Sequence, residues 1–79
     1  MEILNIKSRI ALRKDIEGFD LRIIMLCYDI IRNQKELCEL LNAKKSNVSF
    51  SVNKLINIGL LTRSEISGIY YYKINPYWK

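Results

Sequence analysis

The side chains best able to do chemistry gather in one stretch, KKSNVSFSVNKL, at residues 44–55. Ammonium groups there could bind phosphate oxygens, and short hydroxyl and carboxamide groups could donate to and accept from the edges of bases. If the stretch is a helix, Val48, Val52 and Leu55 turn towards a core and the polar groups lie on the other faces. The candidate nucleic-acid contacts in this stretch are Lys44, Lys45, Ser46, Asn47, Ser49, Asn53 and Lys54.

Phe50 departs from this polar face, because at about 100° per residue its ring points almost directly away from the core. It could be a scattered exposed apolar residue without a role, or it could touch thymine methyl groups. It could also pack against its own copy in a two-fold dimer. We expect the dimer contact, because burying such a ring contributes about 1.5–3 kcal/mol and a chain this short is a marginal monomer.

The sequence lacks the side chains that catalysis and metal binding usually require. The 79 residues contain no histidine, no Gly-rich phosphate loop and no clustered carboxylates. Cys27 and Cys38 lie inside apolar helical patterns without a preceding signal peptide, which indicates reduced, packed thiols in a cytoplasmic protein. No apolar run approaches the roughly 18–20 residues that span a bilayer. We therefore expect no enzyme activity, no metal, no cofactor and no membrane partner.

The excess positive charge is confined to the second half of the chain. Residues 1–43 carry seven basic and seven acidic groups, whereas residues 44–79 carry six basic groups against Glu65 alone. This accounts for the whole net charge of +5. Such an asymmetry favours a face that binds a polyanion, although a merely basic surface would have the same composition.

Helices must hold the polar stretch in place. Ile3, Ile6 and Ile10 are spaced for a short amphipathic helix, whose start could instead be extended. Asp20 is expected to cap a second helix, LRIIMLCYDIIRN at 21–33, whose apolar residues cover most of its circumference. That helix is either central to the domain or covered on one side by a second subunit.

The next two helices frame a turn. The pattern QKELCELLN predicts a helix at 34–42 that turns Leu37, Leu40 and Leu41 inward. After a turn at AKK, Ser46 is expected to cap a helix at about 46–58, which stops at Gly59 because glycine tolerates positive φ. A helix-turn-helix over 34–58 would present the polar stretch on its second helix.

The remainder changes from helical to strand periodicity. LLTRSE and IYYYKIN predict two strands joined at Ser67-Gly68, with Tyr72 and Ile74 turned to the core and Trp78 covering an apolar surface. Arg63 and Lys73 on this hairpin join the candidate nucleic-acid contacts. The sequence thus predicts one α+β domain over 1–79, with three to four helices and a two-stranded hairpin.

Residues 21–76 resemble the winged helix-turn-helix core of ArsR-type bacterial DNA-binding proteins. The resemblance rests on the order and spacing of LRI at 21–23, ELCELL at 36–41, S-x-V-S-x-x-V-x-x-L at 46–55, GLL at 59–61 and G-x-Y-Y-Y-K-I-N-P at 68–76. It implies a recognition helix that reads double-stranded DNA, a wing at 60–75 and a homodimer in which segment 1–18 takes part.

Two departures from the ArsR pattern bear on function. Metal-sensing members carry E-L-C-V-C before the turn, whereas Glu36-Leu37-Cys38-Glu39-Leu40 has one cysteine, so sulfur-based metal sensing is not expected. Members usually add a helix after the wing, whereas this chain ends at Tyr77-Trp78-Lys79. We therefore expect dimerisation through the N-terminal segment, the central helix or the recognition helix.

Dimerisation through Phe50 is similar in architecture to the TubR-like centromere-binding proteins of plasmid and phage partition systems, which place paired recognition helices in one groove. The predicted function is a sequence-specific, DNA-binding homodimer. It would act as a transcriptional autorepressor or as the adaptor of a partition system whose partner is a tubulin-like or other NTPase. The alternative is a winged-helix module that binds an acidic protein without reading DNA.

Overall fold

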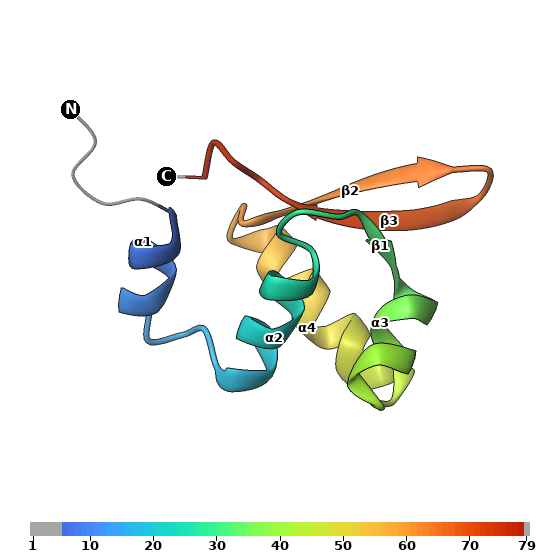
Figure 1. Ribbon diagram of the computed structural model, residues 1–79, viewed down its shortest axis with the longest axis horizontal. Helices are drawn as coiled ribbons and strands as arrows, with labels where there is room; N and C mark the ends of the chain where they lie inside the picture. Colours follow the sequence, from blue (N-terminus) through green and yellow to red (C-terminus); the bar gives the residue numbers. More distant parts are fainter. Residues whose placement is uncertain (1–5, 79) are drawn as a thin grey trace.

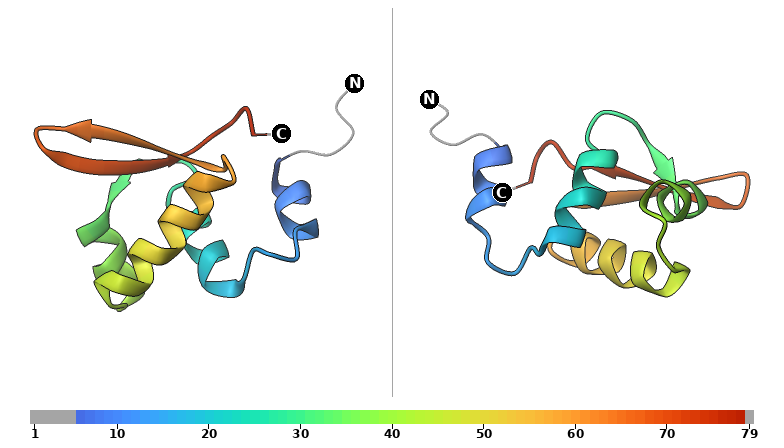
Figure 2. Two further views of the ribbon diagram at one scale, coloured as in Figure 1. Left: turned by 180° about the vertical axis from the view of Figure 1, so that it is seen from behind. Right: turned by 60° about the horizontal axis from the view of Figure 1, so that its bottom comes forward.

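The computed structural model describes residues 6–78 (Figure 1). In chain order its elements are α1 (Ile6–Leu12), α2 (Gly18–Leu26), β1 (Arg32–Asn33), α3 (Gln34–Leu41), α4 (Lys45–Asn57), β2 (Leu61–Ile66) and β3 (Ile69–Ile74). The helices lie on one side of the sheet, and the β2–β3 hairpin extends beyond them as a wing (Figures 1 and 2). The predicted α+β class is confirmed.

The sheet is antiparallel, with strand order β1-β3-β2. The register of the hairpin runs from Leu61 opposite Ile74 to Ile66 opposite Ile69. Ser67 and Gly68 between them have φ of 52° and 80°, so a two-residue turn with left-handed backbone joins the strands. Both predicted strands are confirmed, whereas β1, which pairs Arg32 with Tyr72, was not predicted.

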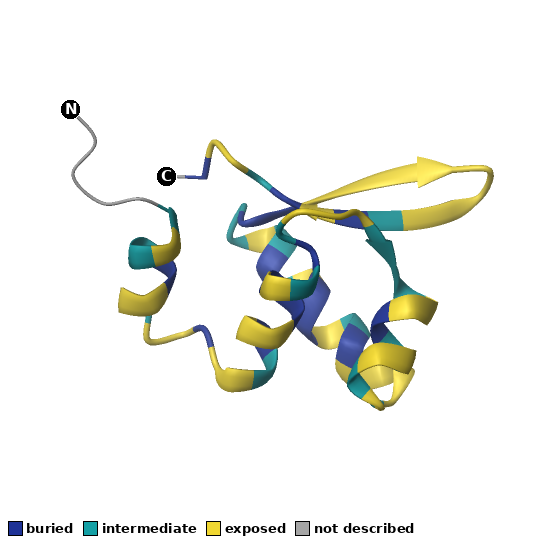
Figure 3. Cartoon of the chain, viewed as in Figure 1, coloured by how far each residue is buried: buried dark blue, intermediate teal, exposed yellow. Residues whose placement is uncertain are grey.

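The core lies between α4 and the elements around it. Helix α4 packs against α2, α3 and β2. Tyr72 and Ile74 are buried as expected, and most of the wing beyond them is exposed (Figure 3). The buried apolar residues are Ile10, Ile16, Ile23, Ile24, Cys27, Leu37, Val48, Val52, Leu55, Leu60, Leu61, Tyr72, Ile74 and Trp78.

The prediction for the second helix is wrong at both ends. Helix α2 begins at Gly18, and Asp20 lies in its first turn, where its carboxylate accepts a hydrogen bond of 2.9 Å from the backbone N–H of Glu17. The helix ends at Leu26 because the following backbone turns to the sheet. The N–H of Ile74 donates to the carbonyl of Cys27 at 3.1 Å, and Arg32 Nε donates to the carbonyl of Leu26 at 2.7 Å.

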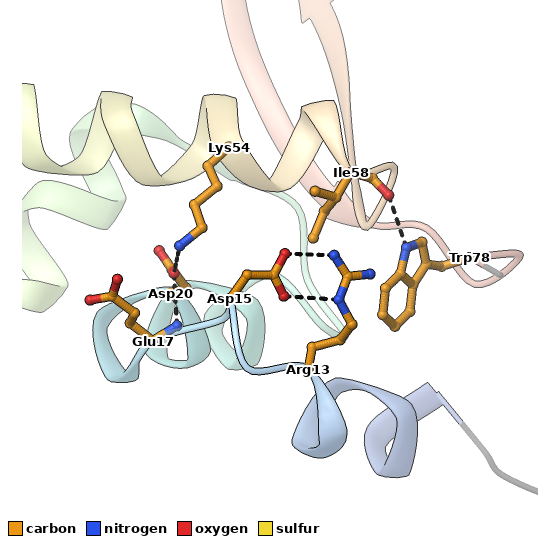
Figure 4. Close-up of polar contacts among 7 residues, drawn as sticks. All are labelled: Arg13, Asp15, Glu17, Asp20, Lys54, Ile58 and Trp78. Carbon is orange, nitrogen blue, oxygen red and sulfur yellow. Dashed lines mark hydrogen bonds and ion pairs between the residues drawn. The ribbon is translucent and has the colours of Figure 1, made fainter.

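Helix α1 is fastened to the C-terminal end of the described chain. The Trp78 ring is buried, as expected, and its Nε1 donates to the carbonyl of Ile58 at 3.0 Å (Figure 4). Arg9 donates to the carbonyl of Trp78, and the guanidinium carbons of Arg9 and Arg13 lie 5.0 and 5.4 Å from the centre of its ring. Ile10 is the buried residue of α1; Ile3, expected on the same helix, lies outside the described residues.

Within residues 6–78, the helices are too short and too polar for any of them to cross a membrane.

Candidate nucleic-acid interface

The turn between α3 and α4 is closed by local hydrogen bonds. At the start of α3, the N–H of Glu36 donates to Asn33 Oδ1 at 2.8 Å, and the N–H of Asn33 donates to Glu36 Oε1 at 2.9 Å. At its end, Asn42 has φ of 50° and the N–H of Ala43 donates to the carbonyl of Cys38 at 3.0 Å. This arrangement stops α3 and lets the chain reverse into α4.

Two expectations for this region are corrected. Helix α4 begins at Lys45 with Lys44 at the capping position, so Ser46 lies in the first turn and is not the N-cap. Leu40 on α3 is exposed, whereas Leu37 is buried and Leu41 half-buried. Leu40 faces solvent because α4 covers only the side of the short helix that carries Leu37. The expected stop at Gly59, with φ of 84°, is confirmed.

Helix α4 has one buried and one exposed face. Val48, Ser51, Val52 and Leu55 are buried, while a stripe on the opposite side is open to solvent. Phe50 lies in the middle of that stripe, with 74% of its surface exposed. The expectation that its ring points outward is confirmed. The other exposed residues of α4 are Lys45, Ser46, Asn47, Asn53 and Asn57; Ser49 is half-buried.

The start of α4 places two cations at the N-terminal end of a helix. Lys44 and Lys45 are both exposed. Gln34, the first residue of α3, reaches across the turn, and its Nε2 donates to the carbonyl of Lys45 at 3.4 Å. Because a helix N-terminus has positive partial charge, this end of α4 is suited to an anion such as a phosphate.

Lys54 is paired within the molecule. Its Nζ lies 2.8 Å from Asp20 Oδ2, and the other carboxylate oxygen of Asp20 accepts a hydrogen bond from Ser51 (Figure 4 shows the ion pair). Burial acts to raise the pKa of Asp20, but hydrogen bonds from Lys54, Ser51 and the Glu17 N–H outweigh it and lower the pKa below its usual value. The contact fixes α4 on the start of α2. The sequence indicated Asp20 only as a helix cap and did not indicate Ser51, because the contact joins residues 31 and 34 positions apart.

The wing carries its two candidate cations on opposite faces. Arg63 is opposite Tyr72 and Lys73 is opposite Thr62, and neighbouring positions of a strand alternate between faces. Both side chains are exposed. The Arg63 guanidinium lies over the ring of Tyr70, 4.4 Å from its centre, which restricts the directions it can take.

The two cysteines are free thiols. Cys27 is buried, and burial raises its pKa to about 11, so the thiol stays protonated at neutral pH. Cys38 is half-buried on α3. Nowhere in residues 6–78 do three or more histidine, cysteine or acidic side chains come together as metal ligands would.

Comparison with known proteins finds solved structures that resemble this one. The sequence matches no protein-family model and no curated protein. Reduced HlyU from Vibrio cholerae N16961 superposes with a TM-score of 0.76 at 20% identity, over 87% of this chain and 73% of its own. The transcriptional regulator BldR from Sulfolobus solfataricus superposes with a TM-score of 0.76 at 22% identity, over 86% of this chain and 51% of its own. This chain therefore spans about half of BldR, and its fold is the winged helix-turn-helix.

Proposed function

We propose that the protein is a homodimer that binds double-stranded DNA with sequence specificity and regulates transcription. The observation that carries the proposal is the exposed face of α4, where short amide and hydroxyl groups follow two exposed lysines at the helix start. Such a face would serve a helix in the major groove, which is wide enough to admit it.

Each candidate residue has a part in this proposal. Lys44, Lys45 and Ser46 contact phosphates at the helix start, and Asn47, Ser49 and Asn53 reach base edges, asparagine being well suited to adenine. Arg63 and Lys73 contact the backbone from the two faces of the wing. Lys54 contributes less to phosphate binding than its position suggests, because its ammonium is already 2.8 Å from Asp20.

We propose that Phe50 forms the interface of the dimer. A surface groove of about 400 Å³ lies beside its ring, lined by Glu17, Phe19, Asp20, Asn47, Phe50, Ser51 and Lys54. Phe50 and this groove are neighbours on one surface. A two-fold axis through that surface would place each ring against the groove of the other protomer. Segment 1–18 is the second candidate for the interface.

Two roles fit such a dimer. It could repress its own operon, or it could be the centromere-binding adaptor of a partition system and recruit a tubulin-like or other NTPase. Both roles need repeated or palindromic sites, since the two protomers present equivalent recognition helices. A neighbouring gene for a tubulin-like GTPase together with upstream repeats would favour segregation.

The DNA proposal is tested with a duplex selected from a random pool. Fluorescence anisotropy at increasing salt should give an affinity that falls as counterions are released. Lys45→Glu and Asn53→Ala should each weaken binding by about tenfold, the first on any duplex and the second mainly on the selected one. Lys14→Glu is the matched control for charge. Equal affinity of wild type and both variants would contradict the proposal and favour a protein-binding module.

The dimer proposal is tested by sedimentation. Phe50→Ala should shift the protein to monomer and weaken DNA binding in the same step, because a dimer holds two recognition helices on one duplex. Leu40→Ala removes an exposed apolar side chain from α3 instead, and it should change neither the association state nor the DNA affinity. A Phe50→Ala variant that stays dimeric and alters only base preference would make Phe50 a thymine contact.

A further inference from the structure

One face of the wing carries two opposite charges and an aromatic ring. Residues directly opposite each other in an antiparallel hairpin share a face. Glu65 is opposite Tyr70 and Arg63 is opposite Tyr72, and alternation along each strand puts all four on the same side of the sheet. Tyr72 is buried there, so this is the side on which the helices lie. Further out the wing is exposed (Figure 3), and there it presents Arg63, Glu65 and Tyr70 to solvent.

The Arg63 guanidinium has two potential partners on this face. The first is the ring of Tyr70, its diagonal neighbour across the strands, and the guanidinium carbon lies over that ring, 4.4 Å from its centre. The second is the carboxylate of Glu65, two residues along the same strand and the one acidic group among residues 44–79. Within residues 6–78, neither Arg63 nor Glu65 belongs to an ion pair. The cation therefore lies on the ring and is not paired with the carboxylate.

The two partners have opposite consequences for an anion that approaches the wing. The face of an aromatic ring attracts the cation and leaves the N–H groups at the edge of the guanidinium free. Those N–H groups can bind a phosphate through two parallel hydrogen bonds. A carboxylate would use the same N–H groups and cancel the charge. Contact with the Tyr70 ring thus keeps Arg63 available, whereas pairing with Glu65 would make it unavailable.

We propose that Tyr70 is a positioning residue for DNA binding. Its ring keeps the Arg63 guanidinium away from Glu65 and holds it out towards a phosphate of the duplex. This inference rests on the proposed function, in which Arg63 contacts the DNA backbone from the wing. Tyr70 acts through its ring and not through its hydroxyl group, because the ring face attracts the cation. A side chain that is already held in place loses less conformational freedom on binding, so the ring raises the affinity without touching the DNA.

Fluorescence anisotropy with the selected duplex measures the effect of the ring. Tyr70→Leu should weaken binding by about three- to tenfold, whereas Tyr70→Phe, which keeps the ring, should bind like the wild type. In the Arg63→Ala background, Tyr70→Leu should have no further effect, because no guanidinium is left to hold. Tyr77→Leu is the matched control: it removes an exposed ring outside the wing and should leave the affinity unchanged.

Glu65 supplies a readout that a merely structural role of Tyr70 would not change. Glu65→Gln removes a negative charge and should strengthen DNA binding modestly when the ring is present. In the Tyr70→Leu background the same change should strengthen binding severalfold more, because it also releases Arg63 from the carboxylate. Equal gains in the two backgrounds would overturn the proposal. A Tyr70→Leu variant that binds as tightly as the wild type, or more tightly, would overturn it too.

The position of Arg63 is measured without DNA by NMR. Protons over an aromatic ring are shielded, so the side-chain N–H resonance of Arg63 should lie upfield in the wild type and in Tyr70→Phe, and move downfield in Tyr70→Leu. Glu65→Gln should then shift this resonance in the Tyr70→Leu background and leave it in place in the wild type. A resonance that is the same in the wild type and in Tyr70→Leu overturns the proposal. Circular dichroism checks that each variant is folded, as expected for a half-exposed side chain outside the core.

The α4 variants separate this proposal from the proposed function. If Lys45→Glu and Asn53→Ala weaken binding while Tyr70→Leu does not, the role of Tyr70 is wrong and the proposed function stands. If no duplex is bound at all, the proposed function fails, and the phosphate contact of Arg63 fails with it whatever the NMR spectrum shows.

Discussion

The carboxylate of Asp20 accepts hydrogen bonds from three groups that belong to two helices. Ser51 and Lys54 donate from α4, and the N–H of Glu17 donates from the start of α2. A buried carboxylate is tolerated only where such partners replace water. Asp20 therefore sets how the candidate recognition helix lies on the body of the domain.

Replacing Asp20 with Asn should lower the free energy of unfolding by about 2–4 kcal/mol, because Ser51 and the Glu17 N–H would lose a charged acceptor. Urea denaturation measures the change. Asp15→Asn is the matched control, because its ion pair with Arg13 is exposed and it should leave the unfolding free energy nearly unchanged. Equal stability of the two variants would show that the Asp20 network is not needed for folding.

The same carboxylate predicts a response to acid. Although burial opposes it, the net effect of the hydrogen bonds from Lys54, Ser51 and Glu17 is a lowered pKa for Asp20 in the folded state. A lowered carboxyl pKa stabilises the fold above its unfolded value, about 3.9, and this contribution is lost as the pH falls through the native pKa. The difference in unfolding free energy between wild type and Asp20→Asn should be constant from pH 5 to 7 and shrink below about pH 4.

For individual residues, sequence periodicity predicted which side chains are exposed but not which side chains are paired. The outward position of Phe50, Asn47 and Asn53 follows from the helical repeat, because Val48, Val52 and Leu55 fix the inner face. The pairing of Lys54 depends on Asp20, 34 residues earlier. Local patterns contain no information on that contact.

Helix α4 is followed, two residues after its last residue Asn57, by a position with left-handed backbone. Gly59 has φ of 84°, whereas Gly18 at the start of α2 has no such requirement and has open space where a Cβ would lie. Gly59→Ala should therefore destabilise the protein by about 1–2 kcal/mol. Gly18→Ala should be neutral or stabilise it by up to about 1 kcal/mol. Thermal unfolding of the two variants makes the comparison, and a Gly59→Ala variant as stable as Gly18→Ala would refute it.

The elements that the sequence predicted are those with their own local signals. Helices α3 and α4 have apolar repeats and end at residues with positive φ, and β2 and β3 flank a Ser-Gly turn. Strand β1 has only two residues and continues an apolar run that predicted helix. Its backbone pairs with β3, and the gain from that pairing outweighs the local helical preference after Leu26.

For the whole molecule, the uneven charge predicts how DNA binding depends on salt. Each phosphate that a lysine neutralises contributes about 0.9 to the slope of log affinity against log salt. In the proposed dimer, Lys45→Ala removes two such contacts and should reduce the slope by about 2. Lys14→Ala, in the half of the chain without net charge, should leave the slope unchanged. Anisotropy titrations at four or five salt concentrations give both slopes, and parallel lines would exclude Lys45 from the phosphate contacts.

The contact between α1 and Trp78 joins residues 69 positions apart in the sequence, Arg9 and Trp78, at the end of the molecule that carries α1 and away from the turn of the wing (Figure 1). A change at Trp78 would therefore act on the position of α1 and leave the exposed face of α4 open.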